Sequence, residues 1–203
     1  MPENPATWCR RMTELTGDYH YYQLTEMWSK NMFDVVFDRV IGHEGGFQKD
    51  PKDRGSWTSG KCGVGELKGT KFGLAAMTYP HLDIEKITQS QAKAIYFEDW
   101  WVALKMDSYP SALAYQMFDA SINHGSGRAI QFVQRAVGVN DDGILGPKTI
   151  KAIHAMDIND VLMLFIAERL QYFTEVKTWD AYGKGWTRRM VQNLRYGAQD
   201  NGK

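Results

Sequence analysis

The sequence predicts a mainly α fold, and two observations support this class. Apolar residues recur at helical intervals of three and four through most of the 203 residues, a chain long enough for one sizeable core. Outside the segment 47–73 we find no convincing strand alternation. That segment carries six glycines, which predicts a long loop or a short hairpin that lines a site.

Capping residues mark where the helices are expected to begin. Asn31 is expected to cap a helix through Ile41, which Gly45 and Gly46 stop. Residues 1–31 precede this helix as an N-terminal extension. Later helices are expected at the Thr88–Gln91 capping box, Pro110, Ser126, Pro147 and Asp157, with a last helix around Trp186.

Charge and cysteine content exclude several classes of protein. The 24 basic and 24 acidic residues cancel, so net charge gives no reason to expect binding to nucleic acid or to a membrane. Cys9 and Cys62 are too few for a disulfide framework, which favours synthesis in a reducing compartment. The sequence shows no signal-peptide core and no run of about 18 apolar residues, so stable membrane insertion is not expected.

A carboxylate ends the first expected helix, where the pattern calls for an apolar residue. Glu44 lies three residues after Ile41 and four after Val40, on the same stripe. Partial burial and the negative carbonyl end of the helix both disfavour its ionised form. An acid that stays protonated near neutral pH suits general-acid catalysis. The alternative is a Glu that pairs with a basic neighbour or faces solvent.

Two further carboxylates, Asp50 and Asp53, follow in the loop QKDPKD. Cleavage of a glycosidic bond commonly uses one protonated acid for the leaving oxygen and one ionised carboxylate that holds a water or stabilises the sugar cation. Glu44 facing a loop Asp would supply this pair, and Gly45 and Gly46 leave one side of Glu44 open to a bulky substrate.

One segment reads GHEGGFQKDPKDRG, residues 42–55, and it resembles the entry motif of glycoside hydrolase family 108. Members are muramidases found largely as phage and prophage endolysins. The resemblance continues to about residue 196 through TQSQAKAIYFEDWW, FDASINHGSGRAIQFVQRAVGV, DDGILGPKTI and GWTRRM. It implies a lysozyme-like fold with a catalytic region over 32–121. A helical peptidoglycan-binding region, packed on it, is implied over 122–197, and residues 1–31 lie outside the resemblance.

The resemblance also implies roles for single residues. Glu44 takes the place of the family's catalytic glutamate, and Asp53, or Asp50, would handle the attacking water. The family pattern also places a threonine beside this aspartate. Either Thr58 or Thr70 can take that place, because the segment 59–69 is inserted between GSWT and TKFGL.

The same match implies contacts with the substrate. Phe72 in TKFGL is expected to touch the sugar, and the insertion to form a flap over the cleft. Trp101, beside Trp100, is expected to stack on a sugar ring, although one of two adjacent indoles on a helix belongs in the core. Asn123 in NHG is expected to bind an N-acetyl group or to cap its helix, and Asp119 either orients it or faces water.

No metal or cofactor is expected. His43 precedes Glu44, but Phe47 stands where an HExxH zinc site needs its second histidine, and the five histidines are scattered.

Together these features predict an endolysin that hydrolyses the β-1,4 bond between N-acetylmuramic acid and N-acetylglucosamine in bacterial peptidoglycan. Its partners are expected to be glycan strands, without nucleic acid, and the chain to be a monomer. Without an export signal it would be made in the host cytoplasm and reach the periplasm or wall through a holin-type partner. Two alternatives are a lytic transglycosylase on the same bond and a non-catalytic wall-binding component of a phage particle.

Overall fold

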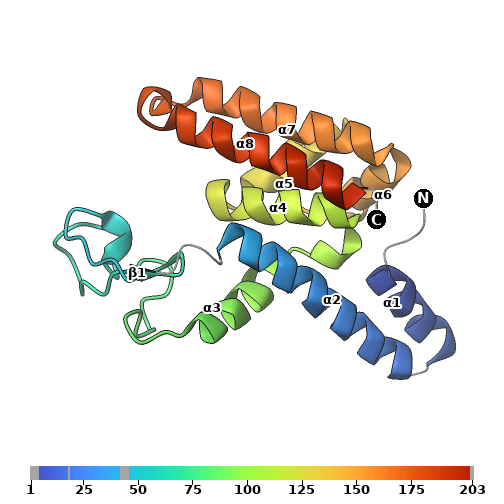
Figure 1. The fold of residues 1–203 in the computed structure, drawn as a ribbon, viewed down its shortest axis with the longest axis horizontal. Helices are drawn as coiled ribbons and strands as arrows, with labels where there is room; N and C mark the ends of the chain where they lie inside the picture. Colours follow the sequence, from blue (N-terminus) through green and yellow to red (C-terminus); the bar gives the residue numbers. More distant parts are fainter. Residues whose placement is uncertain (1–4, 18, 42–45, 202–203) are drawn as a thin grey trace. The chain divides into compact units, whose positions relative to one another are not determined.

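The computed structural model describes residues 5–17, 19–41 and 46–201. The predicted mainly α fold is confirmed, since helices dominate this part of the chain and its sheet has only two strands (Figure 1). None of the helices described combines the length and the apolar character needed to cross a membrane.

The chain folds as two compact units. Residues 33–99 form one, called here the small unit, and residues 1–32 with 100–203 form the other, called here the helical unit. These boundaries differ from the functional regions predicted at 32–121 and 122–197, because α4 (Ser111–His124) packs with the later helices. The functional boundaries themselves stay predictions.

The small unit joins the end of one long helix to a loop, a hairpin and a second helix. The elements are α2 (Tyr19–Val40), the 3-10 turn η1 (Arg54–Ser56), the antiparallel strands β1 (Thr70–Lys71) and β2 (Leu74–Ala75), and α3 (Gln89–Tyr96), which continues into the π-helix η2 (Phe97–Val102). The predicted short hairpin in the glycine-rich segment is therefore present. The buried apolar side chains of this unit are Phe33, Val36, Phe37, Val40, Ile41, Leu74, Ala76, Ile84, Ile87, Ala92 and Tyr96.

The predicted start of α2 at Asn31 is wrong. The helix begins at Tyr19, so Asn31 lies in its interior. Tertiary contacts anchor the earlier turns: Ser29 is buried, its hydroxyl donates to Asp107 at 2.9 Å, and the indole N–H of Trp101 donates to it at 3.2 Å. Such contacts override a local capping preference, so the later part of the predicted extension is continuous with the family-matched helix.

The helical unit is a bundle with α4 at its centre. Ten consecutive residues of α4, Ala112 to Ser121, are buried. Around it pack α5 (Ser126–Ala136), α7 (Ile158–Glu175) and α8 (Trp179–Asn201), while α6 (Pro147–Ala155) contacts α7, and α1 (Pro5–Thr16) contacts the turn η3 (Met106–Ser108).

Several helices begin where capping chemistry predicts. Thr88 and Gln91 form the expected capping box, Pro147 occupies the first turn of α6, and the Asp157 carboxylate accepts from the Asn159 N–H at 2.8 Å. Ser126 is not a cap, because Gly125 serves both α4 and α5. The φ of Gly125 is 82°, a left-handed value that glycine adopts without strain. The chain can therefore end one helix and start the next within one residue.

Candidate functional site

The loop from Gln48 to Thr70 folds back so that its two ends pair. Glu44 itself lies outside the described residues. Four residues later, Gln48 and Thr70 pair, each backbone N–H donating to the other's carbonyl oxygen at 2.9 and 2.7 Å. Gly69 permits this closure, because its φ is +84° and a Cβ there would meet the ring of Phe47 at 2.8 Å and the carbonyl oxygen of Gln48. Thr70 is therefore held beside the first residues of the loop.

The two loop aspartates share one turn, in which the Asp53 N–H donates to the Asp50 carbonyl oxygen at 3.1 Å. The carboxylate of Asp53 caps η1, with one oxygen accepting from the Gly55 N–H at 3.0 Å and the other from the Ser56 hydroxyl at 3.1 Å. Asp50 uses one oxygen, which accepts from the Lys52 N–H at 2.8 Å. Both side chains are exposed. Each thus shapes the loop while remaining open to water.

The two candidate threonines have different surroundings. The Thr58 hydroxyl accepts from the Glu66 N–H at 2.9 Å, and a bridge between Trp57 and Leu67 lies next to this contact. The insertion 59–69 is therefore a loop tied at its base by Thr58. The half-buried Thr70 makes no side-chain hydrogen bond with any residue that the structure describes. Of the two, only the Thr58 hydroxyl is engaged by a described residue.

Phe72 occupies a strained position in the hairpin. It joins β1 to β2 together with Gly73, and their φ angles are 50° and 76°. A two-residue turn with positive φ at both positions favours Asn-Gly, and a bulky residue there costs about 1 kcal/mol. The ring is half-buried, with the Lys71 ammonium 5.5 Å from its centroid. A non-glycine residue kept in such a conformation is a functional candidate.

The remaining predicted contacts, Trp101 and Asn123, belong to the helical unit. Trp101 has no exposed surface, and its ring centroid lies 6.0 Å from that of Phe118. It is the core member of the tryptophan pair, since a covered indole offers no face to a sugar. The side-chain amide of Asn123 donates at 2.6 Å to the carbonyl oxygen of Asp119, one turn earlier in the same helix. The carboxylate of Asp119 does not orient it.

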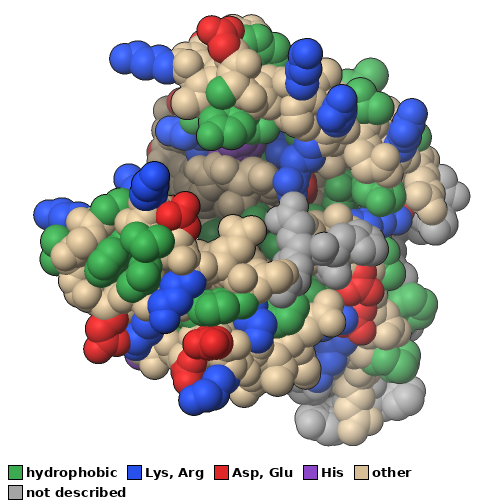
Figure 2. Space-filling view, turned by 60° about the vertical axis from the view of Figure 1, so that its left-hand side comes forward, with side chains coloured by type: hydrophobic (Ala, Val, Ile, Leu, Met, Phe, Trp, Pro, Cys, Tyr) green, Lys and Arg blue, Asp and Glu red, His purple; other side chains and the backbone are tan. Residues whose placement is uncertain are grey.

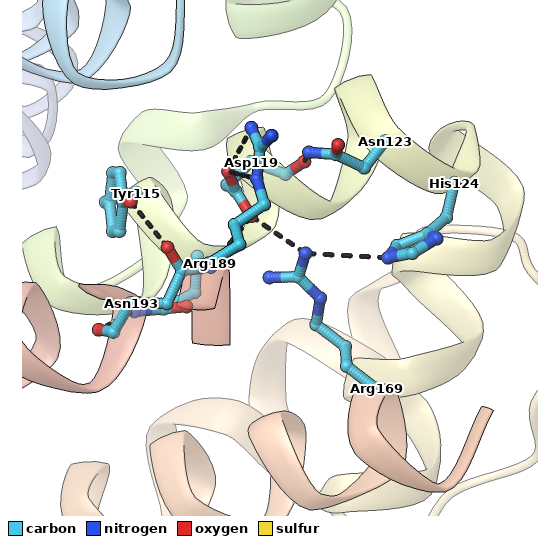
Figure 3. A network of polar contacts seen from close by, with 8 residues as sticks. Tyr115, Asp119, Asn123, His124, Arg169, Arg189 and Asn193 are labelled. Carbon is cyan, nitrogen blue, oxygen red and sulfur yellow. Dashed lines mark hydrogen bonds and ion pairs between the residues drawn. The ribbon is translucent and has the colours of Figure 1, made fainter. Parts of the chain in front are cut away.

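A buried ion network that we did not predict joins three helices of the helical unit (Figure 3). Asp119 on α4 pairs with Arg169 on α7 at 2.8 Å and with Arg189 on α8 at 2.7 Å. Asn193 donates to the same carboxylate at 2.8 Å, and the Tyr115 hydroxyl donates to Asn193 at 2.6 Å. Asp119 is 1% exposed and Arg169 is 0% exposed. Two guanidinium groups thus share one carboxylate.

The network fixes the charge of its members. Burial alone would raise the pKa of Asp119, but the nearby Arg169 and Arg189 outweigh it and hold the pKa below its ordinary value. His124, whose Nε2 lies 3.5 Å from Arg169, has its pKa lowered to about 4, first by burial and then by the Arg169 charge. His124 is therefore neutral at neutral pH. Across the described ranges, no three His, Cys, Asp or Glu side chains gather as metal ligands would.

Two family models match the chain. Residues 37–125 match glycosyl hydrolase 108, and residues 128–191 match a predicted peptidoglycan domain. Both parts of the resemblance inferred from the sequence are thereby confirmed. The first match spans all the predicted site residues, and the second spans Arg169 and Arg189.

The chain is also similar to solved structures. Ten chains match, among them Brucella abortus SagA, with a TM-score of 0.72 and 26% identity over 86% of this chain and 98% of that one. Among curated proteins, none matches.

Proposed function

We propose that this protein is a muramidase, because the chain carries a glycosyl hydrolase 108 region followed by a peptidoglycan domain. It hydrolyses the β-1,4 bond after N-acetylmuramic acid, and Glu44 is the general acid. The observation that carries the proposal is the family match over 37–125, which contains Glu44 and the loop aspartates in the expected order. Val40 and Ile41, four and three residues before Glu44 in the sequence, are 8% and 4% exposed, which supports the proposal of a partly desolvated acid.

The loop supplies the second half of the reaction. Asp53 or Asp50 holds the attacking water, and both remain exposed to it. The Thr70 hydroxyl is the supporting partner, because Thr58 already accepts a hydrogen bond from the backbone of Glu66. Protonation of the leaving oxygen and delivery of water then come from groups that lie within one short stretch of the chain.

Phe72 contributes to substrate binding, and its strain makes this testable. Phe72→Asn is expected to raise the free energy of unfolding by about 1 kcal/mol, because Asn tolerates a positive φ. The same change is expected to raise KM several-fold with little loss of kcat, because a sugar-contacting ring is removed. Urea unfolding and initial rates on glycan fragments measure the two effects. Phe72→Tyr is the control and should keep the wild-type KM; an unchanged KM in Phe72→Asn would remove the role.

The reaction itself is tested by its products. Digestion of purified peptidoglycan is expected to release muropeptides with reducing N-acetylmuramic acid ends, one water heavier than the anhydro products of a lytic transglycosylase. Mass spectrometry before and after borohydride reduction distinguishes them. Anhydro ends would assign the chain to transglycosylases. Binding to peptidoglycan without new ends of either kind would make it a non-catalytic wall protein.

The setting predicted from the sequence belongs to the same proposal. As an endolysin the chain would be made in the cytoplasm of the host and would reach the peptidoglycan through a holin-type partner. Its peptidoglycan domain over 128–191 supports action on the wall.

A further inference from the structure

Aromatic rings gather on one side of the start of α8. Trp179, Tyr182 and Trp186 follow each other at intervals of three and four, so they share a helix face. Trp186 stacks on the buried Phe173 of α7 with ring centroids 4.9 Å apart and planes inclined by 15°. Trp179 and Tyr182 lie 6.2 and 6.0 Å from Trp186 and remain 38% and 60% exposed. The inner rings join two helices, whereas the outer two face solvent.

A glycine inside the helix seats Trp179. Gly183 is buried in the interior of α8, where glycine is less favourable than alanine. A Cβ at this position would lie 2.8 Å from two atoms of the Trp179 indole. Gly183 thus lowers the stability of the helix but leaves room for the Trp179 indole against the helix backbone. Trp179 is 38% exposed, so part of its side chain remains open to a ligand.

Two cations lie near Trp179. A hollow of about 460 Å³ is lined by Trp179, Asp180, Gly183, Lys184, Thr187 and Arg188. Lys184 and Arg188 are exposed and make no ion pair or hydrogen bond with the residues described, and Asp180 is the one acidic residue of the lining. Figure 2 brings the α7–α8 connection forward and shows hydrophobic and Lys or Arg side chains side by side on this face. The hollow therefore combines the Trp179 ring with net positive charge.

We propose that Trp179, Lys184 and Arg188, the aromatic-basic surface, bind a carboxylate-bearing stretch of glycan. The apolar CH face of a sugar ring lies on the exposed indole, and carboxylates reach the two cations. Peptidoglycan carries both groups on one strand, as amino-sugar rings with lactyl and peptide carboxylates. The identity of the ligand rests on the proposed function, but the surface lies outside residues 37–125 and would hold the strand independently of its cleavage.

Binding is measured with the full chain carrying Glu44→Gln, so that strands are not cut. The probes are purified peptidoglycan, chitin, which has similar sugar rings without carboxylates, and single-stranded DNA. Trp179→Ala is expected to weaken cosedimentation with peptidoglycan about tenfold. Lys184→Gln with Arg188→Gln is expected to weaken binding to peptidoglycan, and not to chitin, and to reduce its salt dependence. The matched controls on the same helix, Val191→Ala and Arg195→Gln, are expected to bind within about twofold of the parent.

Gly183→Ala separates binding from folding. The added Cβ displaces the exposed Trp179 indole while alanine favours the helix, so the melting temperature should be at or above that of the parent and peptidoglycan binding should fall.

Three results would overturn the inference. They are a Trp179→Ala variant that binds like the controls, a charge variant that loses chitin and peptidoglycan equally, or tighter binding to DNA than to peptidoglycan. Hydrolysis by the chain with Glu44 intact is scored separately. Normal product release with unchanged binding in the variants would refute this surface alone, and absent product release would refute the proposed function.

Discussion

Glu44→Gln is expected to lower the rate of reducing-end release from peptidoglycan by about 10³-fold. Glutamine keeps the shape of the side chain but has no proton to give to the leaving oxygen, so the transition state loses its acid. The melting temperature should change little, because glutamine has nearly the same volume as glutamate. Initial rates and thermal unfolding of the two proteins measure both effects.

A matched control tests whether any glutamate would behave in this way. Glu85 is an exposed residue of the same unit, and Glu85→Gln is expected to keep the wild-type rate. If Glu44→Gln releases reducing ends as fast as Glu85→Gln, Glu44 is not the acid. The assignment fails in that case even if the chain proves to be a hydrolase.

The same assay decides between the loop aspartates. Asparagine is as good a helix cap as aspartate, so Asp53→Asn keeps η1 in place and any loss of rate reports chemistry. Asp50→Asn is the parallel variant. The aspartate that handles water is expected to lose about 10²-fold in kcat, and the other to stay near the wild type.

Asp119→Asn is expected to lower the free energy of unfolding by about 3–5 kcal/mol. Arg169 has no exposed surface, and its Nε and Nη1 make no hydrogen bond with the described residues, so Asp119 is its compensating charge. Without that charge a cation is left buried beside a second arginine. Urea unfolding measures the loss, which should also lower the melting temperature by roughly 10 °C.

An exposed pair of the same type serves as the reference. Asp141 and Arg135 lie 2.6 Å apart in the same unit, with side chains 43% and 46% exposed. Asp141→Asn should therefore cost no more than about 1 kcal/mol. The double variant Asp119→Leu with Arg169→Met is expected to recover much of the stability lost in Asp119→Asn, because no charge is then stranded in the Asp119–Arg169 pair. Equal losses in Asp119→Asn and Asp141→Asn would contradict the importance of burial.

The sequence predicted local features well where short-range chemistry decides them. The capping box at Thr88, the cap at Asp157 and the hairpin near Phe72 depend on residues a few positions apart. The start of α2 could not be predicted in this way, because Ser29 is held by Trp101 and Asp107, which lie more than 70 residues later. The burial of Trp101 could not be predicted for the same reason, because it depends on the contact with Ser29.

The buried network marks the limit of such reasoning for sites. Arg169 falls on the apolar stripe of α7, and the sequence pattern shows this. The partner of Arg169 could not be predicted, because Asp119 lies 50 residues earlier on α4. Arg189, which shares this carboxylate, lies 20 residues after Arg169 on α8. Pairing across helices depends on how they pack.

By itself the sequence determined the helical class, most helix starts, the glycosyl hydrolase 108 resemblance and the order of Glu44, Asp50 and Asp53. These are properties of spacing along the chain, which periodicity and motif order carry directly. Only the tertiary structure decided that the Thr58 hydroxyl accepts from the Glu66 N–H, that Trp101 is core and that Asp119 holds two arginines. Each of these depends on which distant side chain fills the space or accepts the hydrogen bond, and spacing along the chain does not specify that.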